Sequence, residues 1–187
     1  MSEFKKAMEN YANYVVKEAR NNLAKEGKAG GLLDKSLGFE VKQNRGAGGR
    51  FATGYNAEFF MEDYGIYQDL GVKGNDPSKV SPYAKRKGQQ APNSPFKFGS
   101  GKGKGDFKSF TEKMAEFAKK KNIRFRQGKT GKFAKGGYKS MGYVIASNIY
   151  NRGLRPSLFF TKPFEAGIKK YEDDIAGGFG DDILNQL

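Results

Sequence analysis

Three residues near position 40 have the types and spacing that metal-dependent chemistry needs. Asp34 and Glu40 could hold Mg²⁺ through their carboxylates, while Lys42 stabilises the charge that develops on a phosphate. This is the acid and Glu-x-Lys arrangement of metal-dependent nucleases. The separation is short, and Glu-x-Lys is also common on the solvated face of a strand. A metal-dependent nuclease is therefore an alternative, and a solvated strand is the simpler interpretation.

Two glycine-rich segments match phosphate-binding loops only in part. Gly128-Lys129-Thr130 ends like such a loop, but the motif needs a glycine at position 123, where the chain has Ile123. Residues 101–105 alternate glycine with lysine, which is equally typical of a flexible linker. The acidic pairs within 173–182 lack the regular ligand spacing of a calcium loop. We therefore expect no cofactor and no bound metal.

The chain contains neither cysteine nor histidine. Their absence excludes disulfide bonds, zinc sites built from these residues, thiol nucleophiles and every catalytic triad that uses histidine. Catalysis would have to rest on carboxylates, lysine, tyrosine or a metal held by oxygen alone. We expect a protein that is not an enzyme and has no catalytic residue.

The positive charge of the chain is concentrated in one segment. The formal net charge is +14, and residues 73–135 hold 18 basic and four acidic residues, which accounts for all of it. This density is typical of surfaces that bind polyanions, and the phenylalanines among the lysines could stack on bases. A solvated loop, an acidic protein partner and aromatic residues that fill the core are the alternatives. The candidate nucleic-acid-binding residues are Lys85, Arg86, Lys87, Lys102, Lys104, Arg124, Arg126 and Lys129.

Hydrophobic periodicity indicates which elements position these residues. Apolar residues recur every three or four positions in amphipathic helices and alternate in half-buried strands. The expected elements are helices over 2–25, 107–121, 139–151 and 165–176, strands over 38–42, 51–55 and 57–61, an aromatic turn or short helix over 64–71, a long irregular stretch over 72–105, and a loose tail over 177–180. Ser2 is the expected N-cap of the first helix.

These elements predict the α+β class. We expect an N-terminal amphipathic helix packed on an antiparallel β-sheet, a long basic loop-and-helix insertion, and C-terminal helices. A length of 187 residues fits a single domain. Its parts would be a helix and sheet core (1–72), the basic insertion (73–135), and a helix, a Pro/Phe segment and an acidic tail (136–187).

No apolar run approaches the roughly 20 residues needed to span a bilayer, so we expect no membrane partner. The first residues, Met1-Ser2-Glu3-Phe4, lack the basic-then-apolar pattern of a signal peptide. We therefore expect a soluble protein that is made in a cytoplasm.

Two stretches of sequence resemble a known family. The order of a helix, "GLLDKSLGFEV", a strand pair and "MEDYGIYQDLGVKG" is similar to that of the tail-completion proteins in the neck of tailed bacteriophages. The matching positions are Leu33, Ser36, Leu37, Tyr64, Gly65, Tyr67, Asp69 and Gly71. Residues 142–165, "GYVIASNIYNRGLRPSLFFTKPFE", resemble the closing segment of a subgroup of phage virion proteins. The resemblance covers residues 1–74 and about 107–170, and residues 75–135 are longer and more basic than a minimal member of the family.

The resemblance implies a structural virion protein. Copies would form a ring of six or twelve subunits between the head connector and the tail tube, after assembly in the host cytoplasm. Partners would be the connector-side and tail-tube-side proteins and the double-stranded DNA of the channel. The expected interface residues are Tyr64, Tyr67, Asp69, Gly71, Pro156, Phe159, Phe160 and Phe164, with packing in the chain's own core as the alternative for the aromatic ones. A non-specific nucleic-acid-binding protein is the alternative function.

Overall fold

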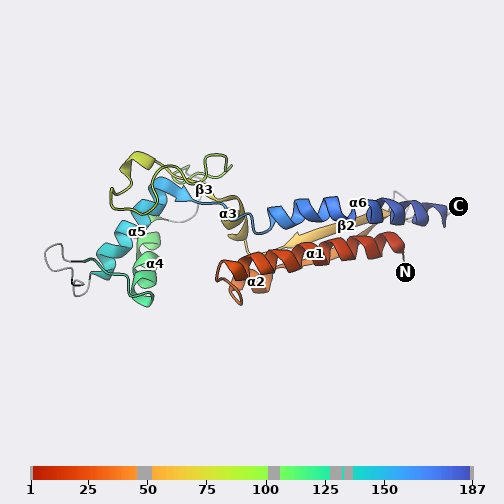
Figure 1. Ribbon diagram of the computed structural model, residues 1–187, viewed down its shortest axis with the longest axis horizontal. Coiled ribbons are helices and arrows are strands. Elements are labelled where there is room, and N and C mark those ends of the chain that lie inside the picture. Colours follow the sequence, from red (N-terminus) through yellow and green to blue (C-terminus); the bar gives the residue numbers. More distant parts are fainter. Residues whose placement is uncertain (1, 46–51, 101–105, 127–131, 133–136, 186–187) are drawn as a thin grey trace. The chain divides into compact units, whose positions relative to one another are not determined.

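The computed structural model describes residues 2–45, 52–100, 106–126, 132 and 137–185. Long helices and a small antiparallel sheet place the chain in the α+β class, as expected (Figure 1). In chain order the elements are α1 (Glu3–Lys25), α2 (Leu32–Ser36), β1 (Gly38–Arg45), β2 (Ala52–Phe60), α3 (Gly65–Leu70), β3 (Val72–Lys73), the 3-10 helix η1 (Pro77–Lys79), α4 (Phe107–Lys120), α5 (Tyr138–Arg152), β4 (Gly153–Leu154) and α6 (Thr161–Leu184).

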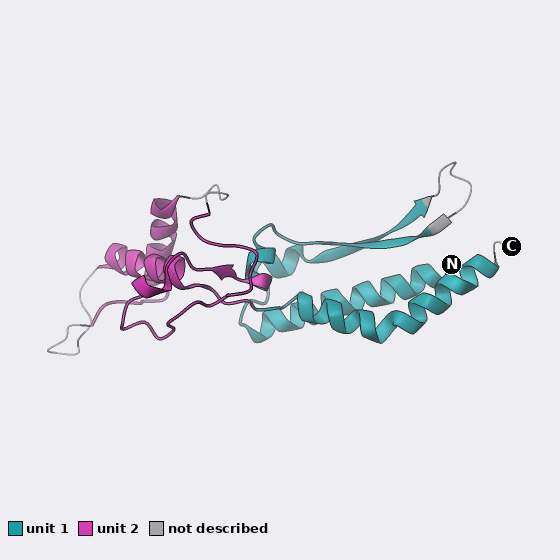
Figure 2. Ribbon diagram, turned by 90° about the horizontal axis from the view of Figure 1, so that it is seen from above, with its two compact units in different colours: residues 1–69, 157–187 teal, residues 70–156 magenta. Residues whose placement is uncertain are grey.

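The chain forms two compact units, coloured separately in Figure 2. Unit 1 comprises residues 1–69 and 157–187, and unit 2 comprises residues 70–156. These limits differ from the expected boundaries after residues 72 and 135. The reason is packing between distant segments, because α6 packs on α1 and α5 packs on α4.

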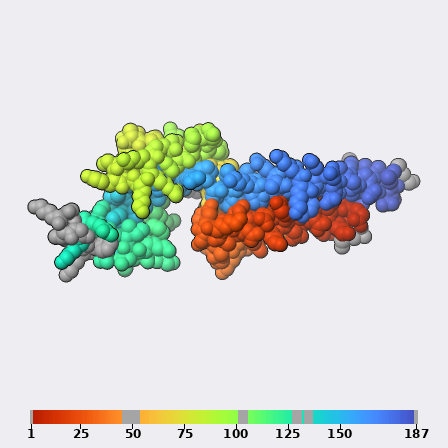
Figure 3. Space-filling model, in the orientation of Figure 1, coloured from red at the N-terminus to blue at the C-terminus, as the bar shows by residue number. Residues whose placement is uncertain are grey.

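Helices α1 and α6 form the long part of unit 1. Ser2 caps α1 as expected, since its Oγ accepts a hydrogen bond from the Lys5 amide at 3.1 Å. Figure 3 shows the two helices, red and blue, in contact along their length. A Cβ on Gly178 would lie 2.8 Å from the Phe4 backbone nitrogen and Cα, so a glycine here permits the close approach.

The expectation of a loose tail over residues 177–180 is wrong. These residues lie inside α6, which is also much longer than the predicted helix over 165–176. Glycine lowers helix propensity, but here the Phe179 ring packs on the Phe4 ring with centroids 5.3 Å apart. Tertiary packing on α1 therefore outweighs the local preference.

Strands β1 and β2 form an antiparallel hairpin in which Gly38 pairs with Phe60 and Asn44 pairs with Gly54. The two strands expected over 51–55 and 57–61 are a single strand. Alternation turns Phe39, Val41 and Phe59 away from solvent relative to their neighbours, and α1 packs against this hairpin.

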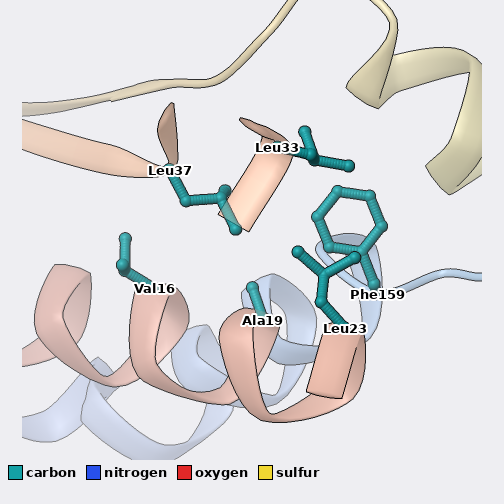
Figure 4. Close-up of a cluster of buried hydrophobic side chains, with 6 residues drawn as sticks. All are labelled: Val16, Ala19, Leu23, Leu33, Leu37 and Phe159. Atoms are coloured by element: carbon teal, nitrogen blue, oxygen red, sulfur yellow. The ribbon is translucent and has the colours of Figure 1, made fainter. Parts of the chain in front are cut away.

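The core of unit 1 lies where α1, α2 and the start of α6 meet. Figure 4 shows Leu23, Leu33 and Phe159 with their side chains directed toward one another. Val16, Ala19 and Leu37 complete this cluster of buried side chains. Phe159 and Leu23 are fully buried, so this cluster anchors α6 to α1.

Unit 2 is built on the helix pair α4 and α5. Gly142 permits their close contact, because a Cβ there would lie 2.5 Å from the Ala115 amide nitrogen. Asp106 caps α4 by accepting a hydrogen bond from the Ser109 amide at 2.6 Å. The irregular segment that follows β3 is tied to this pair, since the Asn75 amide donates to the Tyr150 carbonyl at 2.9 Å.

Candidate assembly site and basic surface

The carboxylate of Asp69 connects the two stretches that carry the family resemblance. Asp69 lies at the end of α3 and is only 4% exposed. Its Oδ1 accepts hydrogen bonds from the amides of Phe160 at 2.8 Å and Thr161 at 3.3 Å, and its Oδ2 accepts one from the Thr161 hydroxyl. The cap residue of α6, Phe160, supplies no side-chain cap of its own. Asp69 therefore caps α6 from a distant part of the chain.

Backbone hydrogen bonds join the same two stretches in unit 1. The Ser157 amide donates to the Gln68 carbonyl at 3.1 Å, and the Leu158 amide donates to the Asp69 carbonyl at 3.0 Å. Leu158 has a φ of 54°, which is rare for a bulky side chain. These hydrogen bonds hold the chain in that conformation as it enters α6.

The position of Gly71 in unit 2 can be occupied only by glycine. Its φ of +71° favours glycine, and a Cβ would lie 2.5 Å from the Leu154 carbonyl oxygen and 2.7 Å from the Pro156 nitrogen. Its own carbonyl accepts a hydrogen bond from the buried Ser94 hydroxyl at 2.8 Å. The glycine of the motif is therefore required by close backbone packing.

Burial corrects part of the expected interface. Phe159 is 0% exposed in the core of unit 1, and Asp69 and Gly71 are buried as well, so these residues act within the chain. Phe160 and Phe164 are half-buried and pack on the Phe59 ring, with centroids 5.3 and 5.9 Å away. Pro156 is also half-buried. The physical reason is that α6 needs apolar side chains at its start to join α1 and the hairpin.

Two residues of the expected interface do face solvent, together with others that the sequence analysis did not identify. Tyr64 and Tyr67 are 45% and 44% exposed. Large exposed apolar side chains also occur on α2, β2 and α3. We call the whole set the α2–α3 apolar patch: Leu32, Phe60, Tyr64, Ile66 and Tyr67.

The elements of the α2–α3 apolar patch are joined to one another. The Glu62 amide donates to the Ser36 hydroxyl at 3.0 Å, and Gly65 packs closely against Leu33 and Met61. Phe60 could have been identified from the sequence, because it follows Phe59 on a strand and adjacent residues face opposite sides. Leu32 and Ile66 carry no such signal, since both lie in helices too short to show periodicity.

The three residues of the alternative nuclease hypothesis, Asp34, Glu40 and Lys42, do not form a metal site in the structure. Asp34 accepts a hydrogen bond from the Gly30 amide at 2.7 Å and lies 3.9 Å from the Arg20 Nε. Lys42 pairs instead with Glu58 at 2.6 Å and with Glu40 at 3.4 Å. The hydrogen bond to Glu58, followed by the charges of Glu40 and Glu58, raises the pKa of Lys42.

Glu40, Lys42 and Glu58 thus form an exposed ion-pair ladder on the outer face of the hairpin. Among the described residues, no three acidic side chains gather in the way that metal ligands do.

The positive charge belongs to unit 2 as a whole. Residues 70–156 contain 21 basic and four acidic residues, a formal net charge of +17, whereas unit 1 has 13 basic and 16 acidic residues, a net −3. Lys85, Arg86 and Lys87 are exposed in the loop that follows η1. After α4, Arg124 is half-buried and Arg126 is exposed. The remaining candidates, Lys102, Lys104 and Lys129, lie outside the described residues, as does the Gly128-Lys129-Thr130 motif.

Several phenylalanines of the basic segment pack on one another. Phe98 stacks on Phe110 with centroids 6.3 Å apart, and Phe107 contacts Tyr150 edge-on at 5.4 Å. Phe98 contacts the Tyr150 ring as well, at 5.6 Å. These rings join α4 to α5 by packing on one another, although Phe107 stays 38% exposed and so is not part of a buried core.

Comparison with protein-family models, with curated proteins and with solved structures finds no match to this chain. Within the ranges that the structure describes, no helix has the length and apolarity needed to cross a membrane.

Proposed function

We propose that the chain is a structural subunit of the bacteriophage neck, which joins head to tail as a ring of identical copies. It would be a virion protein without catalytic turnover. Its partners would be further copies of itself, the proteins on the connector and tail-tube sides, and the DNA of the channel.

One observation carries this proposal: the two resembling stretches meet in space. The first stretch contributes Asp69 and Gly71, and the second contributes Leu154, Phe160 and Thr161, with hydrogen bonds and close packing as described above. Two short motifs that match one family by chance have no reason to complete each other structurally. The contacts between the two stretches therefore support the family resemblance independently of the sequence similarity.

The α2–α3 apolar patch supports the assembly part of the proposal. Its five members range from 44% to 72% exposed, and three of them are aromatic. Aromatic side chains supply large contact areas at protein interfaces. Contact with a neighbouring copy would remove this apolar surface from water, and closed symmetry lets each copy use the same patch.

Paired substitutions test the proposal. The variant Tyr64→Ser with Tyr67→Ser removes two rings of the patch, and Tyr83→Ser with Tyr143→Ser is the matched control, since both tyrosines are exposed in unit 2. We expect the wild type and the control to form rings, seen by light-scattering mass and electron microscopy. The patch variant should shift to smaller species while its circular dichroism stays helical.

A wild-type chain that stays monomeric at every concentration would contradict the assembly proposal. Mass spectrometry of purified phage particles whose genome encodes the chain tests its location. A particle that lacks the chain would contradict the neck role.

The charge of unit 2 supports one alternative, a non-specific nucleic-acid-binding protein. A net charge of +17 within 87 residues attracts phosphate backbones without any sequence preference. This alternative predicts tight DNA binding by a monomer or dimer, with an affinity that falls steeply with salt. The neck proposal predicts ring assembly and weak DNA binding by the free subunit.

A further inference from the structure

Short backbone pairings around β3 bring together basic residues from four separate segments of unit 2. Lys73 pairs with Gly153 of β4 in an antiparallel arrangement and with Lys97 in a parallel bridge. The bridge is closed by hydrogen bonds from the Lys73 amide to the Phe96 carbonyl at 2.8 Å and from the Phe98 amide to the Lys73 carbonyl at 2.9 Å. Paired residues point to the same face of a sheet, so Lys73 and Lys97 carry like charges side by side.

The loop that contains Arg86 is held against the same place. The Gln90 amide donates to the Arg152 carbonyl at 2.8 Å. The Gln89 side chain forms two hydrogen bonds with Gly74, accepting at 2.5 Å and donating at 3.2 Å. The loop therefore joins both β3 and the end of α5.

Arg152 ends α5 and, like Lys73, is half-buried. Its Nε is buried, and in the part of the chain that the structure describes it has no hydrogen-bond acceptor. Burial, followed by the positive charge of Arg86, lowers the pKa of Arg152. A buried guanidinium N–H without an acceptor is unfavourable, and the oxygen of a bound anion is one acceptor that suits its charge.

The acidic residues of unit 2 are used elsewhere. Asp76 bonds Ser78 and pairs with Lys79 at 3.4 Å, and Asp106 caps α4. Glu112 and Glu116 lie exposed on α4. In the described part of the chain, no ion pair joins a carboxylate to Lys73, Arg86, Lys97 or Arg152. Among the described residues, these like charges thus lie in one part of unit 2 without an ion-paired carboxylate.

We propose that Lys73, Arg86, Lys97 and Arg152, the β3–β4 basic cluster, bind a phosphate group of a double-stranded DNA backbone. The identity of the DNA rests on the proposed function, in which the subunit surrounds a DNA channel. Guanidinium groups bind phosphate oxygens through paired N–H donors, and ammonium groups add charge, so two of each suit a phosphodiester. The wider charge of +17 on unit 2 favours a continuous polyanion over a single acidic side chain.

Nuclear magnetic resonance of the full-length labelled chain tests the site directly. The Nε–H signal of Arg152 is followed during titration with a short random-sequence duplex, with inorganic phosphate, and with a peptide of residues 171–185, the acidic part of α6. We expect the duplex to shift this signal at low salt. Inorganic phosphate should shift it only weakly, and the peptide should not compete with the duplex.

A salt series with charge variants supplies the second measurement. The variant Arg86→Gln with Lys97→Gln removes two exposed members of the cluster. The matched control is Lys120→Gln with Lys139→Gln, which removes two exposed charges at the other end of the α4–α5 pair. Lys139 and Arg152 are 13 positions apart along α5, which is about 20 Å.

The cluster variant should reduce the magnitude of the slope of log affinity against log salt by about 1, since the cluster binds one phosphate and each lost phosphate contact contributes about 0.9. The control should leave that slope close to wild type. Equal slopes for the two variants would overturn the site, because net charge alone would then explain binding. An Arg152 signal that responds to inorganic phosphate or to the acidic peptide, but not to the duplex, would overturn it too.

Light-scattering mass separates this inference from the proposed function. If the chain forms rings but its Arg152 signal does not shift with the duplex, the phosphate site alone is overturned. A wild-type monomer that shows the Arg152 shift and the change in slope would overturn the neck role and support the site.

Discussion

Replacing Asp69 with alanine tests whether this carboxylate holds the start of α6. The substitution removes three accepted hydrogen bonds, two from the amides of Phe160 and Thr161 and one from the Thr161 hydroxyl. Loss of an N-cap side chain costs about 0.5–2 kcal/mol. An amide left without an acceptor in a buried place adds about 1–3 kcal/mol. We therefore expect unit 1 to lose about 3 kcal/mol of its free energy of unfolding.

The variant Asp69→Asn removes the negative charge of the side chain but keeps one oxygen that can accept hydrogen bonds. Its amide oxygen can still accept from both backbone amides, and the Thr161 hydroxyl can rotate to accept from the new NH₂ group. We expect a cost of about 1 kcal/mol for this variant. Asp63→Ala is the matched control, because it removes an exposed carboxylate six residues earlier and should change the free energy by less than about 0.5 kcal/mol.

Hydrogen exchange at the Phe160 and Thr161 amides is the most direct assay. A loss of about 3 kcal/mol accelerates exchange on the order of 100-fold for amides that open with unit 1. Urea unfolding followed by circular dichroism gives the change in stability independently. If Asp69→Ala exchanges no faster than Asp63→Ala, the capping argument is refuted.

Two further predictions concern α1 and α6. The substitution Gly178→Ala should destabilise the protein, because the new Cβ would meet the Phe4 backbone at 2.8 Å. The substitution Gly177→Ala has open space around it and should stabilise α6 by about 0.5–1 kcal/mol. Equal urea midpoints for the two variants would contradict this prediction. Burial raises the pKa of Tyr11 to about 12 from 10.0, so folding favours its neutral form and its contribution to stability is lost as pH rises from 10 toward 12. Tyr11→Phe should weaken that loss relative to Tyr14→Phe, and parallel pH profiles would contradict the assignment.

The amino-acid sequence determined the helices whose periodicity is strong. The helix expected over 2–25 is α1 (Glu3–Lys25), and the one expected over 107–121 is α4 (Phe107–Lys120). The helix expected over 139–151 is α5 (Tyr138–Arg152). Local spacing suffices for α1 and α4, because apolar residues recur along one face of each. In α5, Gly137 supplies no side-chain cap and the buried residues include Asn151, so its apolar face is less regular. The excess of positive charge was equally visible in the sequence, although its limits were not.

Only the tertiary structure decided which way the motif residues face. Tyr64 and Asp69 belong to one motif, yet Tyr64 is exposed and Asp69 is buried beneath the start of α6. Phe159 and Phe160 are adjacent, and Phe159 alone is fully buried. Short helices and irregular segments have no repeat from which a buried face could be predicted.

The longest-range features also came from the tertiary structure. Asp69 and Thr161 are 92 residues apart, and Lys73 and Lys97 belong to segments with no strand pattern of their own. The C-terminal half of α6 contains three glycines and still forms a helix, because α1 packs against it. Local sequence encodes the preference of a segment, whereas the contacts that complete caps, charge clusters and close helix pairs depend on partners that folding alone brings near.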